Sequence, residues 1–227
     1  MAMKRITVLL AEDHQIVREG FRSLLEHEHD IEVVGEAETG RQAVQLTRKL
    51  RPAVVVMDIA MPLLNGLEAT RQIRKEFPET KVLILSAHSD DAYVEQVAVL
   101  GAAGFLLKQT SSHELATAIR EVQKGNTFFS PSISRRVHDR SQKPADRAAN
   151  LRKKTNRLSS REVEVLQLIA EGKPNKQVAG ELGVSFKTVD KHRQHLMNKL
   201  DIHDVAGLTR YAIAEGIIES NVRVTIN

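Results

Sequence analysis

The feature that most restricts the fold of this 227-residue chain is an alternation, repeated five times, of short aliphatic runs with segments of helical periodicity. Three of the runs are almost unbroken aliphatic stretches, as strands buried on both faces must be. The intervening segments place apolar residues three and four positions apart, so that one helix face can pack on a sheet. The pattern predicts a doubly wound parallel α/β sheet with right-handed crossovers. The predicted strands are Ile6–Ala11, Ile31–Ala37, Val54–Asp58, Lys81–Ser86 and Gly104–Leu107.

The C-terminal part of the chain has helical signals without strand signals. Ser159 and Glu162 form a capping box at a helix start. A stretch rich in Arg, Lys and Ser, with little apolar periodicity, precedes this region. The sequence therefore predicts an α/β domain over 1–125, a linker over 126–154 and a small all-α domain over 155–227.

Charge is distributed unevenly between the two halves. Residues 1–125 contain 15 Lys and Arg against 18 Asp and Glu, a net charge of −3, whereas residues 126–227 contain 18 against 11, a net charge of +7. A basic region of this kind favours a polyanion partner, most often nucleic acid. An anionic membrane surface, or solubility alone, would also account for it.

The composition excludes several function classes. The chain has no cysteine, which excludes disulfide frameworks, thiol catalysis, iron–sulfur clusters and cysteine-ligated zinc. The apolar run near the N-terminus is too short for a signal peptide or a membrane span, because it soon meets an acidic pair. We therefore expect a cytoplasmic protein that does not insert into a membrane.

Polar side chains follow four of the predicted strands. Glu12 and Asp13 follow the first, Asp58 ends the third, Ser86 ends the fourth and Lys108 follows the fifth. Ligands of open parallel sheets bind at the carboxyl ends of the strands, so we expect these side chains to converge. Three carboxylates this close repel one another unless a hard divalent cation such as Mg²⁺ lies among them.

This set of residues suits phosphoryl transfer. The metal and Lys108 would neutralise charge on the transferring group while Asp58 attacks phosphorus, which leaves an acyl phosphate on Asp58. A single aspartate after a strand is often only a helix cap, but the combined pattern favours a phosphoacceptor. A phosphatase similar to the haloacid dehalogenases would need a second acid at position 60, where this chain has Ala60. We therefore expect that the protein is not an enzyme.

Four segments resemble the receiver domain of two-component response regulators, and the likeness covers residues 4–125. They are LLAEDH, VVVMDIAMPLLNGLE, VLILSAH and GAAGFLLKQ. The resemblance implies a flavodoxin-like (βα)5 fold in which Asp58 accepts a phosphoryl group from a sensor histidine kinase. It also implies that Asp13, Asp58 and the backbone carbonyl of Ala60 bind Mg²⁺, and that Glu12 acts through metal-bound water.

The same resemblance assigns residues beyond the carboxylates. Ser86 and Lys108 would hold the phosphoryl oxygens, and Phe105 stands where the family carries an aromatic switch residue. Phe105 lacks the hydroxyl group of tyrosine, so a switch at this position works by packing alone. Gln109 replaces a proline that many receivers have, and we therefore do not expect the usual cis peptide bond.

Residues 175–200 have the pattern helix, tight turn, helix. Gly183 can end the first helix in a left-handed conformation, and Ser185 can cap the second. By spacing alone, an ordinary amphipathic helix pair would explain this pattern. Residues 158–214 nevertheless closely resemble the LuxR-type helix-turn-helix domain.

That resemblance makes the second helix the element that reads DNA in the major groove. It assigns base contacts to three residues and phosphate contacts to five others. The base contacts are Asp190, Lys191 and Gln194, and the phosphate contacts are Lys176, Lys187, Thr188, Arg193 and Lys199.

The family uses its last helix, here 205–215, for dimer contacts, and the candidate residues are Val205, Leu208 and Ala212. Packing on the domain's own core would explain the same stripe equally well.

These observations predict a response regulator of the NarL/FixJ type. Such a protein takes a phosphoryl group from a histidine kinase, binds double-stranded promoter DNA and forms a homodimer when phosphorylated. An alternative is a phosphorelay or interaction module whose basic domain binds no specific DNA sequence.

Overall fold

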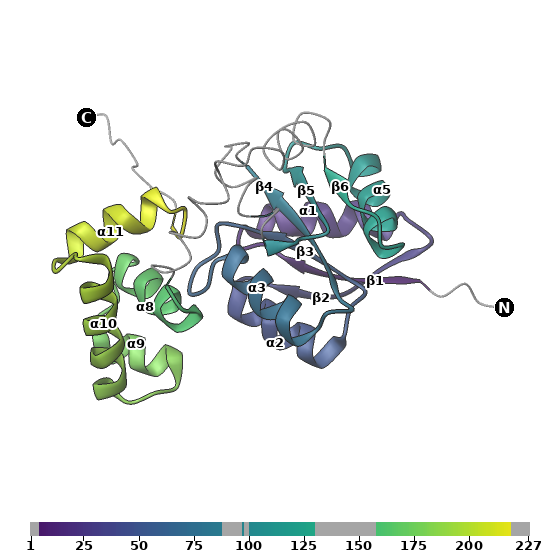
Figure 1. The fold of residues 1–227 in the computed structure, drawn as a ribbon. Helices are drawn as coiled ribbons and strands as arrows, with labels where there is room; N and C mark the ends of the chain where they lie inside the picture. The colour runs from purple at the N-terminus through teal and green to yellow at the C-terminus, as the bar shows by residue number, and fades with distance from the viewer. Residues whose placement is uncertain (1–4, 88–96, 98–99, 130–157, 219–227) are drawn as a thin grey trace. The chain divides into compact units, whose positions relative to one another are not determined.

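The computed structural model describes residues 5–87, 97, 100–129 and 158–218 (Figure 1). The chain divides into two compact units, Met1–Arg147 and Ala148–Asn227, and each is described by itself below. Among the residues that the structure describes, no helix has both the length and the apolar character that crossing a bilayer requires.

The first unit contains a parallel sheet whose strand order is β2-β1-β3-β4-β5-β6. The first five strands confirm the sequence prediction, and their order is the flavodoxin-like arrangement, with its reversal point beside β1 and β3. They are β1 (Ile6–Ala11), β2 (Ile31–Ala37), β3 (Val54–Asp58), β4 (Lys81–Ser86) and β5 (Gly104–Leu107).

The sixth strand, β6 (Phe128–Phe129), was not predicted. It pairs with β5 so that Phe128 lies opposite Gly104 and Phe129 opposite Phe105. The sheet therefore extends past residue 125 into the range predicted as linker. The remainder of that range, 130–154, lies outside the described residues.

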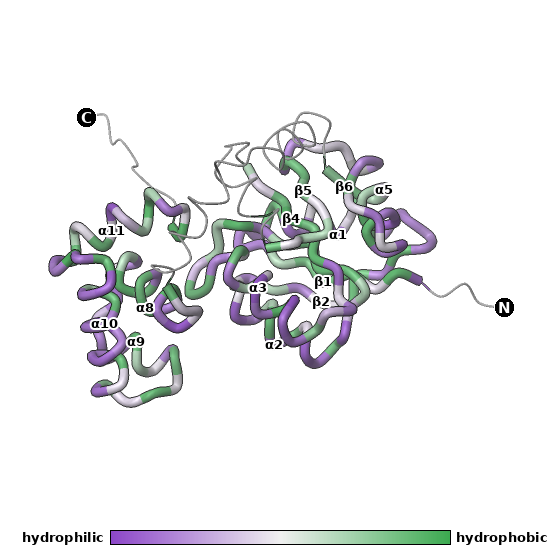
Figure 2. Tube along the Cα trace, in the orientation of Figure 1, coloured by the Kyte–Doolittle hydropathy of each residue, from purple (hydrophilic) through white to green (hydrophobic). Residues whose placement is uncertain are grey.

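Helices cover both faces of the sheet. The apolar side chains of α1 (Gln15–Glu26) and α5 (Ser112–Gln123) pack with Val8, Val54 and their neighbours on one face. On the other face, α2 (Gly40–Leu50) and α3 (Gly66–Glu76) pack with the alternate strand residues. The green, apolar colour of the central strands in Figure 2 follows this burial on both sides.

The second unit is all-α among the described residues. Its helices are α8 (Ser160–Ala170), α9 (Asn175–Leu182), α10 (Phe186–Leu200) and α11 (Val205–Ala214). The structure confirms the capping box of Ser159 and Glu162, and the cap of α10 by Ser185. Gly183 adopts a left-handed conformation with φ 62° at the end of α9, as predicted.

The loop between β3 and α3 approaches the backbone of Asp58 very closely. The Gly66 amide donates to the Ile59 carbonyl over 2.8 Å. A Cβ atom at Gly66 would lie 1.8 Å from the Asp58 carbonyl oxygen. Because backbone atoms surround this position, only glycine fits here without displacing the end of β3. None of the described peptide bonds is cis.

We predict that Gly66→Ala lowers the free energy of unfolding by about 1–3 kcal/mol, the usual cost of forcing volume into a packed site. The matched control is Gly20→Ala on α1, where a Cβ atom would meet no atom within 4 Å. This control should stabilise the protein by about 0.5–1 kcal/mol, because alanine is the better helix former. Urea unfolding measures both changes, and equal effects of the two substitutions would contradict the steric argument.

Candidate acidic site and candidate nucleic-acid interface

The ends of β1, β3 and β5 bring together three of the predicted site residues. Asp58 ends β3, Glu12 directly follows β1 and Lys108 directly follows β5. The Lys108 ammonium nitrogen lies 2.7 Å from Glu12 Oε2 and 3.0 Å from Asp58 Oδ2. Both carboxylate side chains are only 3% exposed. The structure therefore contains a buried charge cluster at the carboxyl edge of the sheet.

The electrostatics of the cluster depend on burial. Burial, with repulsion from Glu12, raises the pKa of Asp58 to about 6, against the opposing attraction of Lys108. The Asp58 Oδ1 atom accepts a hydrogen bond from the Ile59 amide over 2.8 Å. Burial disfavours the ammonium form of Lys108, but attraction to Asp58 and Glu12 outweighs it and raises the pKa of Lys108.

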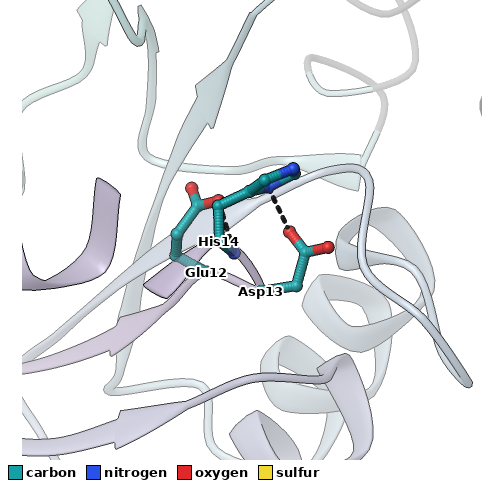
Figure 3. A group of neighbouring side chains, drawn as sticks. All are labelled: Glu12, Asp13 and His14. Carbon is teal, nitrogen blue, oxygen red and sulfur yellow. Dashed lines mark hydrogen bonds and ion pairs between the residues drawn. The ribbon is translucent and has the colours of Figure 1, made fainter. Parts of the chain in front are cut away.

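Asp13 lies beside Glu12, and its side chain is 27% exposed. Figure 3 shows that both carboxylates approach the ring of His14. The His14 Nδ1 atom lies 2.9 Å from Asp13 Oδ1 and 3.1 Å from Glu12 Oε1. The Asp13 carboxylate is the main reason that the pKa of His14 is raised. One ligand atom from each of these three residues lies within 4.8 Å of the others, a spacing that a metal ion could bridge.

The remaining predicted residues of the sheet edge have different environments. Ser86 is buried at the end of β4, where its carbonyl oxygen accepts from the Lys108 amide over 2.8 Å. Phe105 is fully buried in the core on the α2 and α3 side of the sheet. Ala60 is half-buried in the turn after Asp58.

The donor set at this edge fits a hard divalent cation. It consists of carboxylate oxygens, which are among the ligands that Mg²⁺ prefers. The described residues provide one ammonium group, that of Lys108, for the buried atoms Glu12 Oε2 and Asp58 Oδ2. One lysine does not balance three carboxylates, so a bound cation would relieve the remaining repulsion.

Sequence reasoning missed Arg18, which the structure places directly behind the acidic site. Its side chain is 8% exposed, and its Nη1 atom donates to the Glu12 carbonyl oxygen over 2.7 Å. The signal was present, because Arg18 shares the spacing of the buried Phe21 and Leu25 on α1. A charged residue on the apolar stripe of a helix indicates a buried polar partner.

The helix α10 presents several of the predicted DNA-binding residues to solvent. Lys187, Asp190, Lys191 and Gln194 are exposed, and Thr188 is half-buried. Lys176 is exposed near the start of α9. An open hollow on this surface is lined by Ser185, Lys187, Thr188, Lys191, His192 and His195. A basic helix face with hydroxyl groups at its N-terminal end is suited to phosphate oxygens.

Two of the predicted phosphate contacts have partners inside the domain. The Arg193 Nη1 atom donates to Asn175 Oδ1 over 3.0 Å. The Lys199 ammonium lies 3.1 Å from Glu162 Oε2, in the capping box of α8. Burial opposes ionisation of Glu162, but the Ser159 amide and Lys199 together lower the pKa of this carboxyl group. Both cations therefore also hold helices of this unit together.

The predicted dimer residues on α11 do not share one environment. Leu208 and Ala212 are 0% exposed because α11 packs against α8. These two side chains stabilise the domain itself, which is the core-packing alternative that the sequence left open. Val205 is 44% exposed, and Ile213 on the same helix is 39% exposed.

Comparisons with known proteins agree with both units. The response regulator receiver domain matches residues 8–120, and the family of bacterial regulatory proteins called the luxR family matches residues 156–212. The chain is 35% identical over 231 residues to the transcriptional regulatory protein DegU of Brevibacillus brevis, and this alignment covers 97% of this chain and 96% of DegU. It is 38% identical over 214 residues to the oxygen regulatory protein NreC of Staphylococcus aureus, and this alignment covers 93% of this chain and 99% of NreC.

Solved structures of the RcsB response regulator show the same architecture. One, from Salmonella typhimurium, is 30% identical with a TM-score of 0.56, and the match covers 93% of this chain and 100% of the RcsB chain. Another shows two RcsB dimers bound to two parallel DNAs. Its RcsB chain is 30% identical with a TM-score of 0.56, and the match covers 92% of this chain and 98% of the RcsB chain.

A parallel α/β unit with an acidic edge, joined to a helix-turn-helix unit, defines a two-component response regulator. The chain belongs to the NarL/FixJ-type response regulators, as DegU and NreC do. It is a DNA-binding transcription regulator controlled by phosphorylation.

The raised pKa of Asp58 predicts a pH dependence of stability. Between pH 4 and pH 6, folded Asp58 holds a proton that the unfolded chain releases, so stability falls as pH rises through this window. In Mg²⁺-free buffer, Asp58→Asn should therefore stabilise the protein by roughly 1–3 kcal/mol at pH 8, because a tenfold change in proton affinity corresponds to about 1.4 kcal/mol. The gain should disappear near pH 4. Urea unfolding at both pH values tests this, and a gain that does not depend on pH would contradict it.

Proposed function

We propose that Asp58 is the phosphoacceptor and that a sensor histidine kinase is the donor. The observation that carries this proposal is the buried Asp58 carboxylate at the end of β3, held by Lys108 at 3.0 Å. A carboxylate oxygen attacks phosphorus, the bond between phosphorus and the kinase imidazole nitrogen breaks, and an acyl phosphate remains on Asp58. With a pKa of about 6, Asp58 is mostly ionised at neutral pH and can act as the nucleophile.

The other residues of the sheet edge would assist this transfer. Asp13, Asp58 and the Ala60 carbonyl would hold Mg²⁺, with Glu12 beside them. When bound, the ion supplies positive charge that stabilises the phosphoryl oxygens in the transition state. The Lys108 ammonium supplies a second positive charge, and its present contact with Glu12 keeps it at the site.

Control of the output would pass through Ser86 and Phe105. The Ser86 hydroxyl would bind a phosphoryl oxygen and draw the end of β4 toward Asp58, while Phe105 repacks in the core. Phe105 lies opposite Phe129 in the sheet, so a shift of β5 also moves β6. Phosphorylation would thereby bias a two-state equilibrium of this edge rather than build a new structure.

The helix-turn-helix unit would bind double-stranded promoter DNA through α10. We assign the bases to Asp190, Lys191 and Gln194, all of which are exposed. The phosphate contacts would be Lys176, Lys187, Thr188, Arg193 and Lys199. Arg193 would have to leave or share its partner Asn175, and Lys199 its partner Glu162. RcsB dimers on DNA support a homodimer of the phosphorylated chain, and exposed Val205 is the remaining candidate contact on α11.

The direct test is selection from a pool of fragmented DNA by the full chain with Mg²⁺, in the presence and absence of beryllofluoride, which imitates a phosphoryl group on Asp58. We expect beryllofluoride to enrich a shared, roughly two-fold symmetric site, because a two-fold dimer favours inverted repeats. Equal enrichment without beryllofluoride would refute control through Asp58. A chain that enriches no sequence in either condition would instead be an interaction module.

Asp58→Asn removes the nucleophile and should abolish the effect of beryllofluoride on DNA affinity, while binding without it persists. An Asp58→Asn variant that responds to beryllofluoride like the wild type would contradict the assignment of Asp58.

The full chain should also release no phosphate from small phosphate esters over many turnovers, since a regulator stores the phosphoryl group.

Contacts to bases and to phosphates should respond differently to substitution. Gln194→Ala should weaken binding to the selected site by about 1–3 kcal/mol and relax specificity at one base pair. Lys187→Ala should weaken binding to DNA of all sequences alike and reduce the slope of log affinity against log salt concentration by about 1. Arg210→Ala, which removes an exposed charge from α11, is the control and should change neither quantity. Titrations by fluorescence anisotropy at several salt concentrations measure these effects, and a Lys187→Ala variant that loses sequence preference would contradict the assignment.

A further inference from the structure

Arg18 connects the acidic site to the neighbouring strand. Its Nη1 atom donates to the Glu12 carbonyl oxygen over 2.7 Å. Its Nε atom donates to Glu36 Oε2 over 3.2 Å, and its Nη2 atom donates to Glu38 Oε1 over 2.8 Å. Glu36 and Glu38 lie on either side of the last residue of β2, so one guanidinium group joins α1, the end of β1 and the end of β2.

The contact with Glu12 fixes one particular peptide group. The Glu12 amide donates to the Ala37 carbonyl over 2.9 Å, and the Glu12 carbonyl accepts from Arg18. The first bond holds the peptide group that precedes Glu12, and the bond from Arg18 holds the peptide group that joins Glu12 to Asp13. Because the two acidic side chains branch from either end of this peptide, its orientation sets their separation.

The charge of Arg18 is balanced locally, since Glu36 and Glu38 accept from the same guanidinium. Its influence on the site is therefore geometric. The planar guanidinium provides donors in three fixed directions, which a lysine ammonium on a flexible chain does not reproduce. Arg22 offers a close comparison, because in the described part of the chain its guanidinium pairs with Glu36 at 2.5 Å and with Glu26 at 2.8 Å rather than with Glu12.

We propose that Arg18 is a positioning residue for the acidic site. By holding the Glu12 carbonyl, it sets the spacing of the Glu12 and Asp13 carboxylates and thereby the affinity of the site for Mg²⁺. This inference rests on the proposed function, in which these carboxylates serve a metal-dependent phosphoacceptor. Arg18 itself would touch neither the metal nor the phosphoryl group, because its donors are directed at Glu36, Glu38 and the Glu12 carbonyl.

The test is isothermal titration of the full chain with MgCl₂ for the wild type, Arg18→Lys, Arg18→Gln and Arg22→Gln. We expect both Arg18 variants to raise the Kd for Mg²⁺ by roughly 10-fold or more, the effect typical of outer partners of metal ligands. Arg22→Gln should leave the Kd within about twofold of the wild type, because the bond from Arg18 to Glu12 remains. Each titration is made well below the unfolding temperature of its variant, so that lost stability does not enter the Kd.

A kinetic readout separates positioning from a merely structural role. With acetyl phosphate as donor, the Arg18 variants should need more Mg²⁺ for half-maximal phosphorylation but reach the wild-type rate at saturating Mg²⁺. If Arg18→Gln does not fold, Arg18→Lys decides the question alone, since it retains a cation between Glu36 and Glu38.

The outcomes distinguish the two proposals. One outcome is that the wild type binds Mg²⁺, Asp13→Asn does not, and the Arg18 variants keep the wild-type Kd. This outcome would overturn the role of Arg18 and leave the proposed function standing. A wild-type chain that binds no Mg²⁺ would overturn both.

Discussion

One ammonium group shared by two buried carboxylates is the interaction on which the proposed function of this protein depends. Lys108 reaches from the end of β5, past β4, to Asp58 on β3 and Glu12 after β1. Burying two such carboxylates is costly unless a cation accompanies them. The strand order brings the Lys108 ammonium to both carboxylates, and the negative charge that remains would favour binding of a divalent cation.

Much of the fold could be predicted because burial on both faces of a parallel sheet demands uninterrupted aliphatic strands. The runs ending at Ala11 and Asp58 showed this directly, and the confirmed strand ends placed Glu12 and Lys108 at one edge. The strand β6 could not be predicted in the same way. Two phenylalanines are too short for a periodic signal, and their role depends on where Gly104 leaves room for another backbone.

The candidate site was less predictable where a residue's role depends on three-dimensional contacts. Arg18 belongs to an apolar helix stripe in sequence, and only the fold shows that its donors meet a backbone carbonyl of the acidic loop. Leu208 and Ala212 could equally well have faced a second chain or their own core, and the packing of α11 on α8 decides for the core. For Lys199, sequence could not reveal the competing partner Glu162 on another helix.

The most direct test of the central claim is to locate the phosphoryl group chemically. The full chain is incubated with acetyl phosphate and Mg²⁺, the acyl phosphate is reduced with borohydride, and the peptides are analysed by mass spectrometry. Our account predicts homoserine at position 58, at a yield that depends on Mg²⁺ and falls sharply in Lys108→Ala. Homoserine at another acidic position, or none at position 58, would contradict it.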